Sequence, residues 1–307
     1  MTQAEPARSL GERILGFVDG FFDVPVDHDD AVVEERAEWM VLAIFITAIF
    51  EVHSSSRSGV FIAGEYIVPP YHLFMGCAFA LWLWGRRTLG YALALGIAVF
   101  VHLRDLPRAP NHGWLEVSLF LVLLLVGIET HRNRRAVLGA CRWMALTAIF
   151  ASAFQKLAYG GYTNGAYLAY LMANSPKTTW LLSWMTTPAE LERLIALGTE
   201  PGDGPYLIRS PLWVAMSNAV WILELVLPVA VIVRVTRRWA VPVILAVFGF
   251  IAVLSQELVF SSFMMAVLIP MLPRIPGRSY HVVQTFVLSL YVFWRMFRDT
   301  VLPPPPI

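Results

Sequence analysis

Lys156 is the residue of this sequence that most needs a chemical explanation. It lies near the end of the apolar stretch 141–158, just before Gly160 and Gly161. An ammonium group inside a membrane costs roughly 3 kcal/mol on insertion scales, so it either snorkels to the headgroups or is held there by a function. A buried lysine that loses its proton can act as a general base. As a base at a helix end, it should be replaceable by methionine without loss of the fold.

Asn111 and His112 stand directly before another apolar run, which begins at Trp114. An imidazole in this place can donate a hydrogen bond to a developing oxyanion. A lone histidine there is also an ordinary loop residue. Glu116 follows His112 by one helical turn, a spacing that allows the carboxylate to orient the imidazole.

Glu224 lies near the middle of the apolar stretch 212–233. A carboxylate inside a membrane span is a functional candidate by default. The structural alternative is a hydrogen bond across a helix interface, to Asn218, to Gln155 or to a tyrosine, which would fix the packing without touching a substrate.

Short motifs around these residues resemble the horizontally transferred transmembrane (HTTM) core of the vitamin K-dependent gamma-carboxylase family. The resemblance rests on Asn111-His112 at the start of one helix and Lys156-Leu157 at the end of the next. It continues through Glu224–Pro228 (ELVLP), Arg234–Arg237 (RVTR) and Phe260–Pro270 (FSSFMMAVLIP). It therefore covers roughly residues 105–272 as a series of spaced motifs.

The resemblance implies an enzyme of the lyase and oxygenase type that acts on reduced vitamin K or another quinol. In that reading Lys156 deprotonates the quinol and His112 stabilises an oxyanion. Oxygen and carbon dioxide are the implied co-substrates, and a peptide or small molecule is the acceptor. The residues expected to hold the quinone are Asn111, Glu224, Tyr159 and Tyr162. An aromatic belt at the membrane interface is the other interpretation of the tyrosines.

Two departures from the family pattern keep another class of function open. Phe248-Gly249 stands where the family commonly has a Phe-His pair, so one polar group of the pocket is expected to be absent. The large extramembrane region that binds protein substrates in the animal enzymes has no expected counterpart. The alternative is a non-catalytic transporter or a quinone- or lipid-binding protein in which the same residues shape a polar cavity.

The composition indicates a polytopic membrane protein. Of 307 residues, 57% are hydrophobic and 15% are charged, and the mean hydropathy is +0.62, far from a soluble domain. A net charge of +1 without a basic stripe predicts no nucleic-acid partner. Cys77 and Cys141 lie in or beside apolar segments, so neither a disulfide nor a metal site is predicted.

The apolar runs predict an all-α transmembrane bundle of about eight or nine spans within one domain, residues 39–300. The candidate spans are 39–52, 68–84, 89–103, 114–128, 141–158, 212–233, 239–256, 258–272 and 281–297. Residues 1–38 are expected to form an amphipathic interfacial helix followed by an acidic connection. No cleavable signal peptide is expected before the first span.

The arginines predict the orientation of these spans. Arg86-Arg87, the group 132–135, the group 234–238 and Arg274 with Arg278 fall in alternate loops, which should be cytoplasmic. The protein is thus expected in a plasma or inner membrane with its N-terminus inside. The site and the long connection at about 159–211 would face outward, and within that connection 188–197 predicts a short amphipathic helix.

Overall fold

The computed structural model describes residues 30–51, 61–62, 65–66, 70–104, 113–174, 183, 186–196, 210–233, 236–254 and 258–272. The predicted interfacial helix before residue 30, the span at 281–297 and the residues Asn111 and His112 lie outside this part of the chain.

The described residues form an all-α bundle, as the apolar runs predict. The α-helices are α2 (Asp30–Glu51), α3 (Pro70–Leu83), α4 (Arg87–Arg104), α5 (Gly113–Val126), α6 (His131–Tyr159), α7 (Ala166–Asn174), α9 (Pro188–Ile195), α10 (Pro211–Ile232), α11 (Arg237–Leu254) and α12 (Leu258–Leu268), which continues as the 3-10 turn η3 (Ile269–Met271). One small feature was not predicted. Strands β1 (Phe61–Ile62) and β2 (Glu65–Tyr66) pair antiparallel, with Phe61 opposite Tyr66.

Two helices are long and apolar enough to cross a membrane, by length and composition. They are the segments His131–Ala158 of α6 and Pro211–Ile232 of α10. Four shorter apolar helices accompany them: Tyr71–Leu83, Arg87–Leu103, Trp114–Val126 and Phe260–Met271. A 14-residue helix such as α3 rises only about 21 Å, less than the ~30 Å hydrocarbon core. The described helices therefore do not establish eight or nine complete spans.

Most helices lie where the apolar runs predict them, and two begin much earlier. The stretch 239–272, too long for one span, divides into α11 and α12. Helix α2 begins at Asp30 rather than residue 39, so the predicted acidic connection is partly helical. Helix α6 begins at His131 rather than residue 141. Both extensions carry charged residues, which a search for apolar runs passes over although Glu and Arg are good helix formers.

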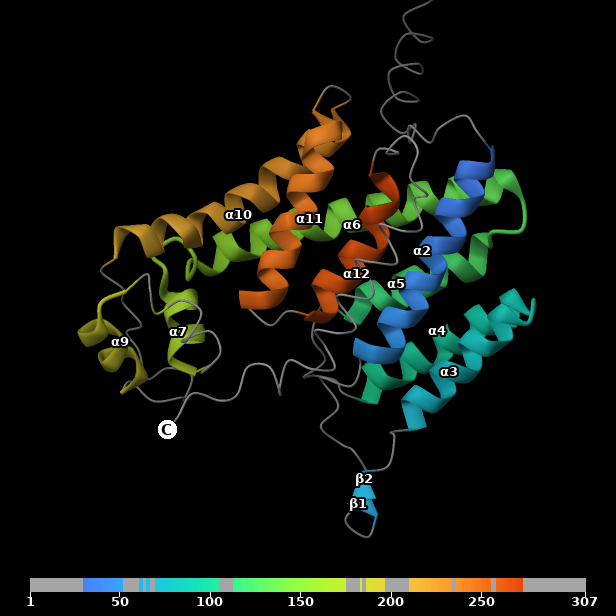
Figure 1. The fold of residues 1–307 in the computed structure, drawn as a ribbon, viewed down its shortest axis with the longest axis horizontal. Helices are drawn as coiled ribbons and strands as arrows, with labels where there is room; N and C mark the ends of the chain where they lie inside the picture. The colour runs from blue at the N-terminus through green and yellow to red at the C-terminus, as the bar shows by residue number, and fades with distance from the viewer. Residues whose placement is uncertain are drawn as a thin grey trace, which may run out of the picture.

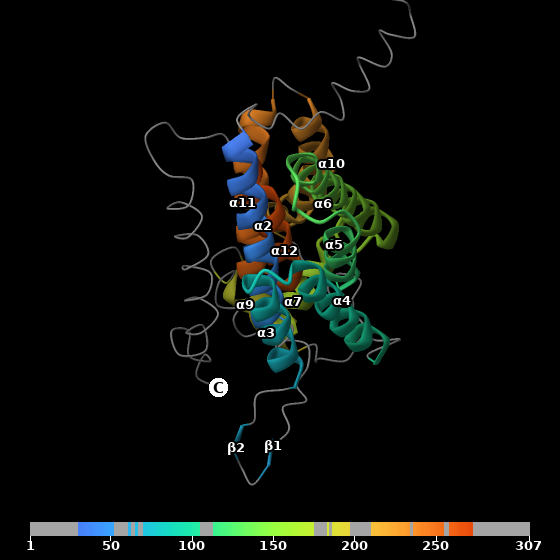
Figure 2. The same ribbon diagram turned by 90° about the vertical axis from the view of Figure 1, so that its right-hand side faces the viewer.

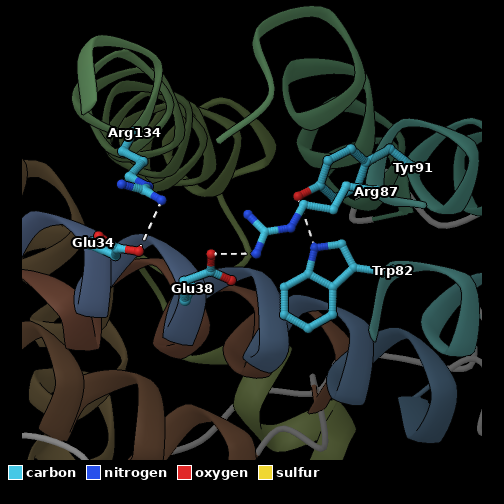
Figure 3. Close-up of polar contacts among 6 residues, drawn as sticks. All are labelled: Glu34, Glu38, Trp82, Arg87, Tyr91 and Arg134. Carbon is cyan, nitrogen blue, oxygen red and sulfur yellow. Dashed lines mark hydrogen bonds and ion pairs between the residues drawn. The ribbon is translucent and has the colours of Figure 1, made fainter. Parts of the chain in front are cut away.

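The charged start of α2 is held by ion pairs to two other helices. Arg134 of α6 lies 3.0 Å from Glu34, and Arg87 of α4 lies 2.8 Å from Glu38 (Figure 3). Exposed pairs of this kind contribute up to about 1 kcal/mol each. Their positions show that the starts of α2, α4 and α6 lie at the same end of the bundle.

The described helix ends next to the other arginine-containing connections lie at that end as well. In Figure 1 the α3–α4 and α5–α6 turns, the end of α10, the start of α11 and the end of α12 lie on the upper and right side, with the start of α2. The start of α5, the end of α6, α7 and α9 lie toward the opposite end. A second view places β1 and β2 beyond the helices (Figure 2). Consecutive long helices therefore run antiparallel, as helices crossing one layer back and forth would.

The core lies around α2, which packs against α3, α6 and α12. Phe45 of α2 is fully buried, and its ring centroid lies 5.2 Å from Phe120 of α5 and 5.5 Å from Phe79 of α3. A polar contact fixes two neighbouring helices. The Trp82 indole donates to the Tyr91 hydroxyl at 2.9 Å, which joins α3 to α4 (Figure 3).

The connection between α6 and α10 has more helix than the sequence suggests. The predicted amphipathic segment is confirmed as α9, with Thr187 as its N-cap and Leu194 buried. Helix α7 was not predicted. Its sequence, AYLAYLMAN, is too short and too evenly apolar to show the hydrophobic periodicity of a helix. Both helices lie beside the end of α6, where Lys156 is.

Candidate functional site

A buried ion pair between α6 and α10 is the centre of the candidate site. Lys156 is 9% exposed and Glu224 is 2% exposed. The ammonium nitrogen, Nζ, donates to Glu224 Oε1 at 2.5 Å and to Oε2 at 2.6 Å. A third hydrogen bond goes to Ser152 Oγ at 2.9 Å. An ammonium has three N–H donors, and here each has an acceptor. The side chain therefore points into the bundle and does not snorkel toward headgroups.

Helix α6 places Lys156 through its regular spacing and its two caps. Thr130 caps the start by accepting from the backbone N–H of Asn133 at 3.1 Å. Ser152 precedes Lys156 by four residues, so both side chains lie on one face of the helix. Gly160 ends the helix with a φ of 70°, and its N–H donates to Leu157. Only a glycine adopts this backbone conformation without strain.

Helix α10 places Glu224 at an interruption of its backbone hydrogen bonding. Pro228 stands four residues after Glu224 inside the helix. Because proline has no N–H, the carbonyl of Glu224 loses its helical donor. The carboxylate is thus buried next to a weakened point of the helix, and Lys156 is its cationic partner.

Tyr162 lies in the turn after α6, close to the ion pair. Lys156 Nζ lies 5.3 Å from the centroid of its ring, within cation–π range. The Tyr162 ring stacks on that of Tyr167, with centroids 4.6 Å apart. Its backbone carbonyl accepts from the Ser217 hydroxyl at 2.7 Å. Tyr162, one of the residues expected to hold the quinone, thus lies beside Lys156.

Lys156 is a partner of Glu224 that the sequence did not suggest. Asn218 donates to the carbonyls of Thr163 at 3.0 Å and Val214 at 2.8 Å, and accepts from the Trp221 indole. The amide of Asn218 thus ties α10 to the turn after α6. The sequence suggested Asn218, Gln155 or a tyrosine as the group that fixes Glu224, and the structure places Lys156 there.

A cavity of about 480 Å³ has Ser152 as one of its lining residues. This volume is within the usual ~300–1,000 Å³ of small-molecule sites. Helices α5, α6 and α12 provide its walls, which are mainly apolar and aromatic. The lining residues are Trp114, Leu115, Ser118, Trp143, Met144, Thr147, Ala148, Ala151, Ser152, Gln155 and Phe260. Ser152 belongs to both the cavity and the hydrogen bonds of the ion pair.

The remaining predicted site residues are placed less fully. Asn111 and His112 lie outside the described residues, and Tyr159 is the last residue of α6. Glu116, suggested as a support for His112, is buried and accepts from the Tyr71 hydroxyl at 2.7 Å. This bond joins α3 to α5. Gly249 has open space where a side chain would begin.

Sequence reasoning missed two groups near the site. Ser152 could have been found from its four-residue spacing to Lys156. His102 of α4 is buried, its Nδ1 lies 2.9 Å from the carbonyl of Ala98, and its ring centroid lies 5.5 Å from that of Trp114, a cavity residue. A histidine near a helix end gave no distinguishing signal.

Comparison with known proteins adds no relative. The chain matches no family model, no curated protein and no solved structure. No group of three or more side chains able to hold a metal ion occurs in the part of the chain that the structure describes.

Proposed function

We propose that this chain is an integral membrane enzyme that deprotonates a reduced quinone, with Lys156 as the base. The observation that carries the proposal is the buried contact of Lys156 with Glu224, one side chain away from a cavity of suitable size. Burial of an ion pair costs several kcal/mol per ion before the attraction is counted. A chemical role therefore explains this buried ion pair better than a contribution to the stability of the fold does.

The carboxylate does not prevent the lysine from serving as a base. A proton shared between Lys156 and Glu224 can sit on either group, and the pair is neutral overall in both cases. When Glu224 holds the proton, Lys156 is an uncharged amine. Uptake of a proton from a quinol then leaves the pair with a single positive charge, which stabilises the oxyanion that forms beside it.

The membrane setting is supported by α6 and α10, which are long and apolar enough to span. Exposed apolar side chains accompany them, including Trp84 in the α3–α4 turn, Phe100 of α4 and Leu125 of α5. A quinone with an apolar tail would reach the cavity from such surroundings. The later steps implied by the resemblance, reaction with oxygen and trapping of carbon dioxide by an acceptor, belong to the same proposal, with His112 as the oxyanion donor.

Replacement of Lys156 by arginine tests the proposal. Arginine keeps the positive charge and can pair with Glu224, but it does not release its proton at any accessible pH. Quinol consumption by Lys156→Arg should fall by about two to four orders of magnitude, with His112→Ala assayed in parallel. Thermal unfolding in detergent checks that each variant is folded. Full turnover by well-folded Lys156→Arg would refute the role of the lysine.

A second candidate function is a quinone- or lipid-binding membrane protein without catalysis. The observation that favours it is that all three donors of the Lys156 ammonium already have acceptors. The two candidates differ in one measurement. A binding protein would retain a quinone stoichiometrically and show no oxygen-dependent consumption of quinol.

A further inference from the structure

Ser152 belongs to two environments, the ion pair and the cavity. Its Oγ accepts from Lys156 Nζ at 2.9 Å. The same residue forms part of the cavity wall. Lys156 is not among the described lining residues of the cavity. Within those residues, Ser152 is therefore the direct link between the cavity and the ion pair.

The hydrogen-bonding capacity of the hydroxyl is only partly used. A serine hydroxyl offers one donor and two acceptor positions. Among the described residues, the bond from Lys156 occupies one acceptor position. The hydroxyl can therefore donate a hydrogen bond to a group in the cavity. When Lys156 is an uncharged amine, the hydroxyl can instead donate to Nζ. A proton relay requires both of these hydrogen bonds.

The cavity wall indicates the kind of molecule that reaches Ser152. Trp114 of α5 and Trp143 of α6 are aromatic lining residues, while Ala148 and Ala151 leave space along α6. Flat rings pack well against indoles and small side chains. The polar lining groups are few, with Ser118 facing from α5. The wall therefore fits a flat, apolar ring that carries a hydroxyl group.

We infer that Ser152 relays a proton from a ring hydroxyl in the cavity to the Lys156–Glu224 pair. The ligand O–H bond breaks and its proton bonds to Ser152 Oγ, while the serine's own proton bonds to Nζ of the uncharged lysine. Glu224 keeps the proton that it took from Lys156. The products are a ligand oxyanion, an unchanged serine and a pair with one positive charge, so protons and charge balance.

This inference rests on the proposed function, because it takes the ion pair as the proton acceptor. It adds that the lysine need not touch the substrate. It also sets a geometric requirement, since the reacting oxygen must lie within hydrogen-bonding distance of Ser152 Oγ. Groups elsewhere in the cavity contribute to binding alone.

The first experiment separates relay from binding in the full-length protein in detergent. Menadione binding is followed by quenching of tryptophan fluorescence, and consumption of its reduced form, menadiol, by absorbance. Ser152→Ala should bind menadione as the parent does but consume menadiol about 100-fold more slowly. Ser152→Thr, which keeps a hydroxyl, should restore most of the rate. Thr88→Ala, which removes an exposed hydroxyl of α4 outside the described cavity wall, is the control and should leave both near the parent values. A Ser152→Ala rate equal to that of the parent would overturn the relay.

The second experiment reads the proton itself by infrared difference spectroscopy. Addition of menadiol to the parent should produce a carboxylic acid band that Glu224→Gln lacks. We expect this band to be absent from Ser152→Ala and present in Thr88→Ala. If the band persists in Ser152→Ala, the relay is wrong. If the parent shows the Ser152-dependent band but consumes no menadiol, the relay stands and the proposed enzyme activity fails.

A third pair of variants tests the cavity as the place of binding. Ala148→Phe fills the cavity from α6 without replacing a member of the relay and should abolish menadione binding. Ala219→Phe adds the same ring on an exposed position of α10 outside the described cavity wall and should bind as the parent does. Normal binding by folded Ala148→Phe would place the ligand elsewhere and overturn the inference.

Discussion

Lys156 and Glu224 are expected to stabilise the fold only together. Lys156→Met removes the cationic partner of a buried carboxylate, which should lower the free energy of unfolding by about 3–5 kcal/mol. The double variant Lys156→Met/Glu224→Leu removes both charges and should be more stable than the single variant. Denaturant titration in detergent micelles measures the difference. Arg193→Met, which removes an exposed pair with Glu190 on α9, is the control and should cost at most about 1 kcal/mol.

Equal destabilisation by the single and double variants would contradict the cost assigned to the buried carboxylate once its cationic partner is lost. The expected result differs from the sequence-based expectation that the protein stays folded when methionine replaces Lys156. That expectation treated the lysine as an isolated side chain at a helix end. Both residues could be selected from the sequence, because a charge in an apolar run is costly. Their pairing could not, because no local rule relates positions 68 residues apart.

At the scale of helices, the replacement of Gly160, which ends α6, should measurably lower the thermal stability. Gly160→Ala places a Cβ atom at a φ of 70°, which costs about 1–2 kcal/mol. Helix α6 should end less sharply, and Tyr162 should move relative to Lys156. The neighbouring Gly161→Ala is a close control, because the added Cβ would meet Tyr167 only at an ordinary 3.7 Å. Thermal unfolding of the two variants should differ clearly, and equal melting temperatures would contradict the argument.

At the scale of helices, the sequence was most informative where apolar residues were continuous. The lengths of α3, α4, α5 and α10 follow from such runs, and turns such as the one at Gly85 separate them. The charged starts of α2 and α6 were missed because a search for apolar runs passes over charged residues. Helix α7 was missed because a short, mainly apolar stretch can form a helix or a strand equally well.

At the scale of the whole molecule, the arginine-rich end is predicted to face the cytoplasm. In a Cys77→Ser background, Arg132→Cys and Ala189→Cys place single probes on exposed positions at opposite ends, at the start of α6 and on α9. A membrane-impermeant maleimide added to intact cells should label the Ala189→Cys protein only. Labelling of the Arg132→Cys protein instead would show that the orientation is the opposite one, with the ion pair toward the inner face. Solubilised protein, in which both probes should react, is the control.

The packing of α2 has a consequence for how the chain is assembled. Its Arg36 donates to the carbonyl of Leu272 at 3.3 Å, across 236 positions of sequence. At a synthesis rate of ~5–20 residues per second, those positions take about 12–47 s to emerge from the ribosome. During that interval the side of α2 that packs on α12 has no α12 to pack against, and in the proposed membrane setting lipid or the insertion machinery would cover it. Substitutions late in the chain, in α12, should therefore cause the misinsertion of α2 and the early degradation of the whole protein.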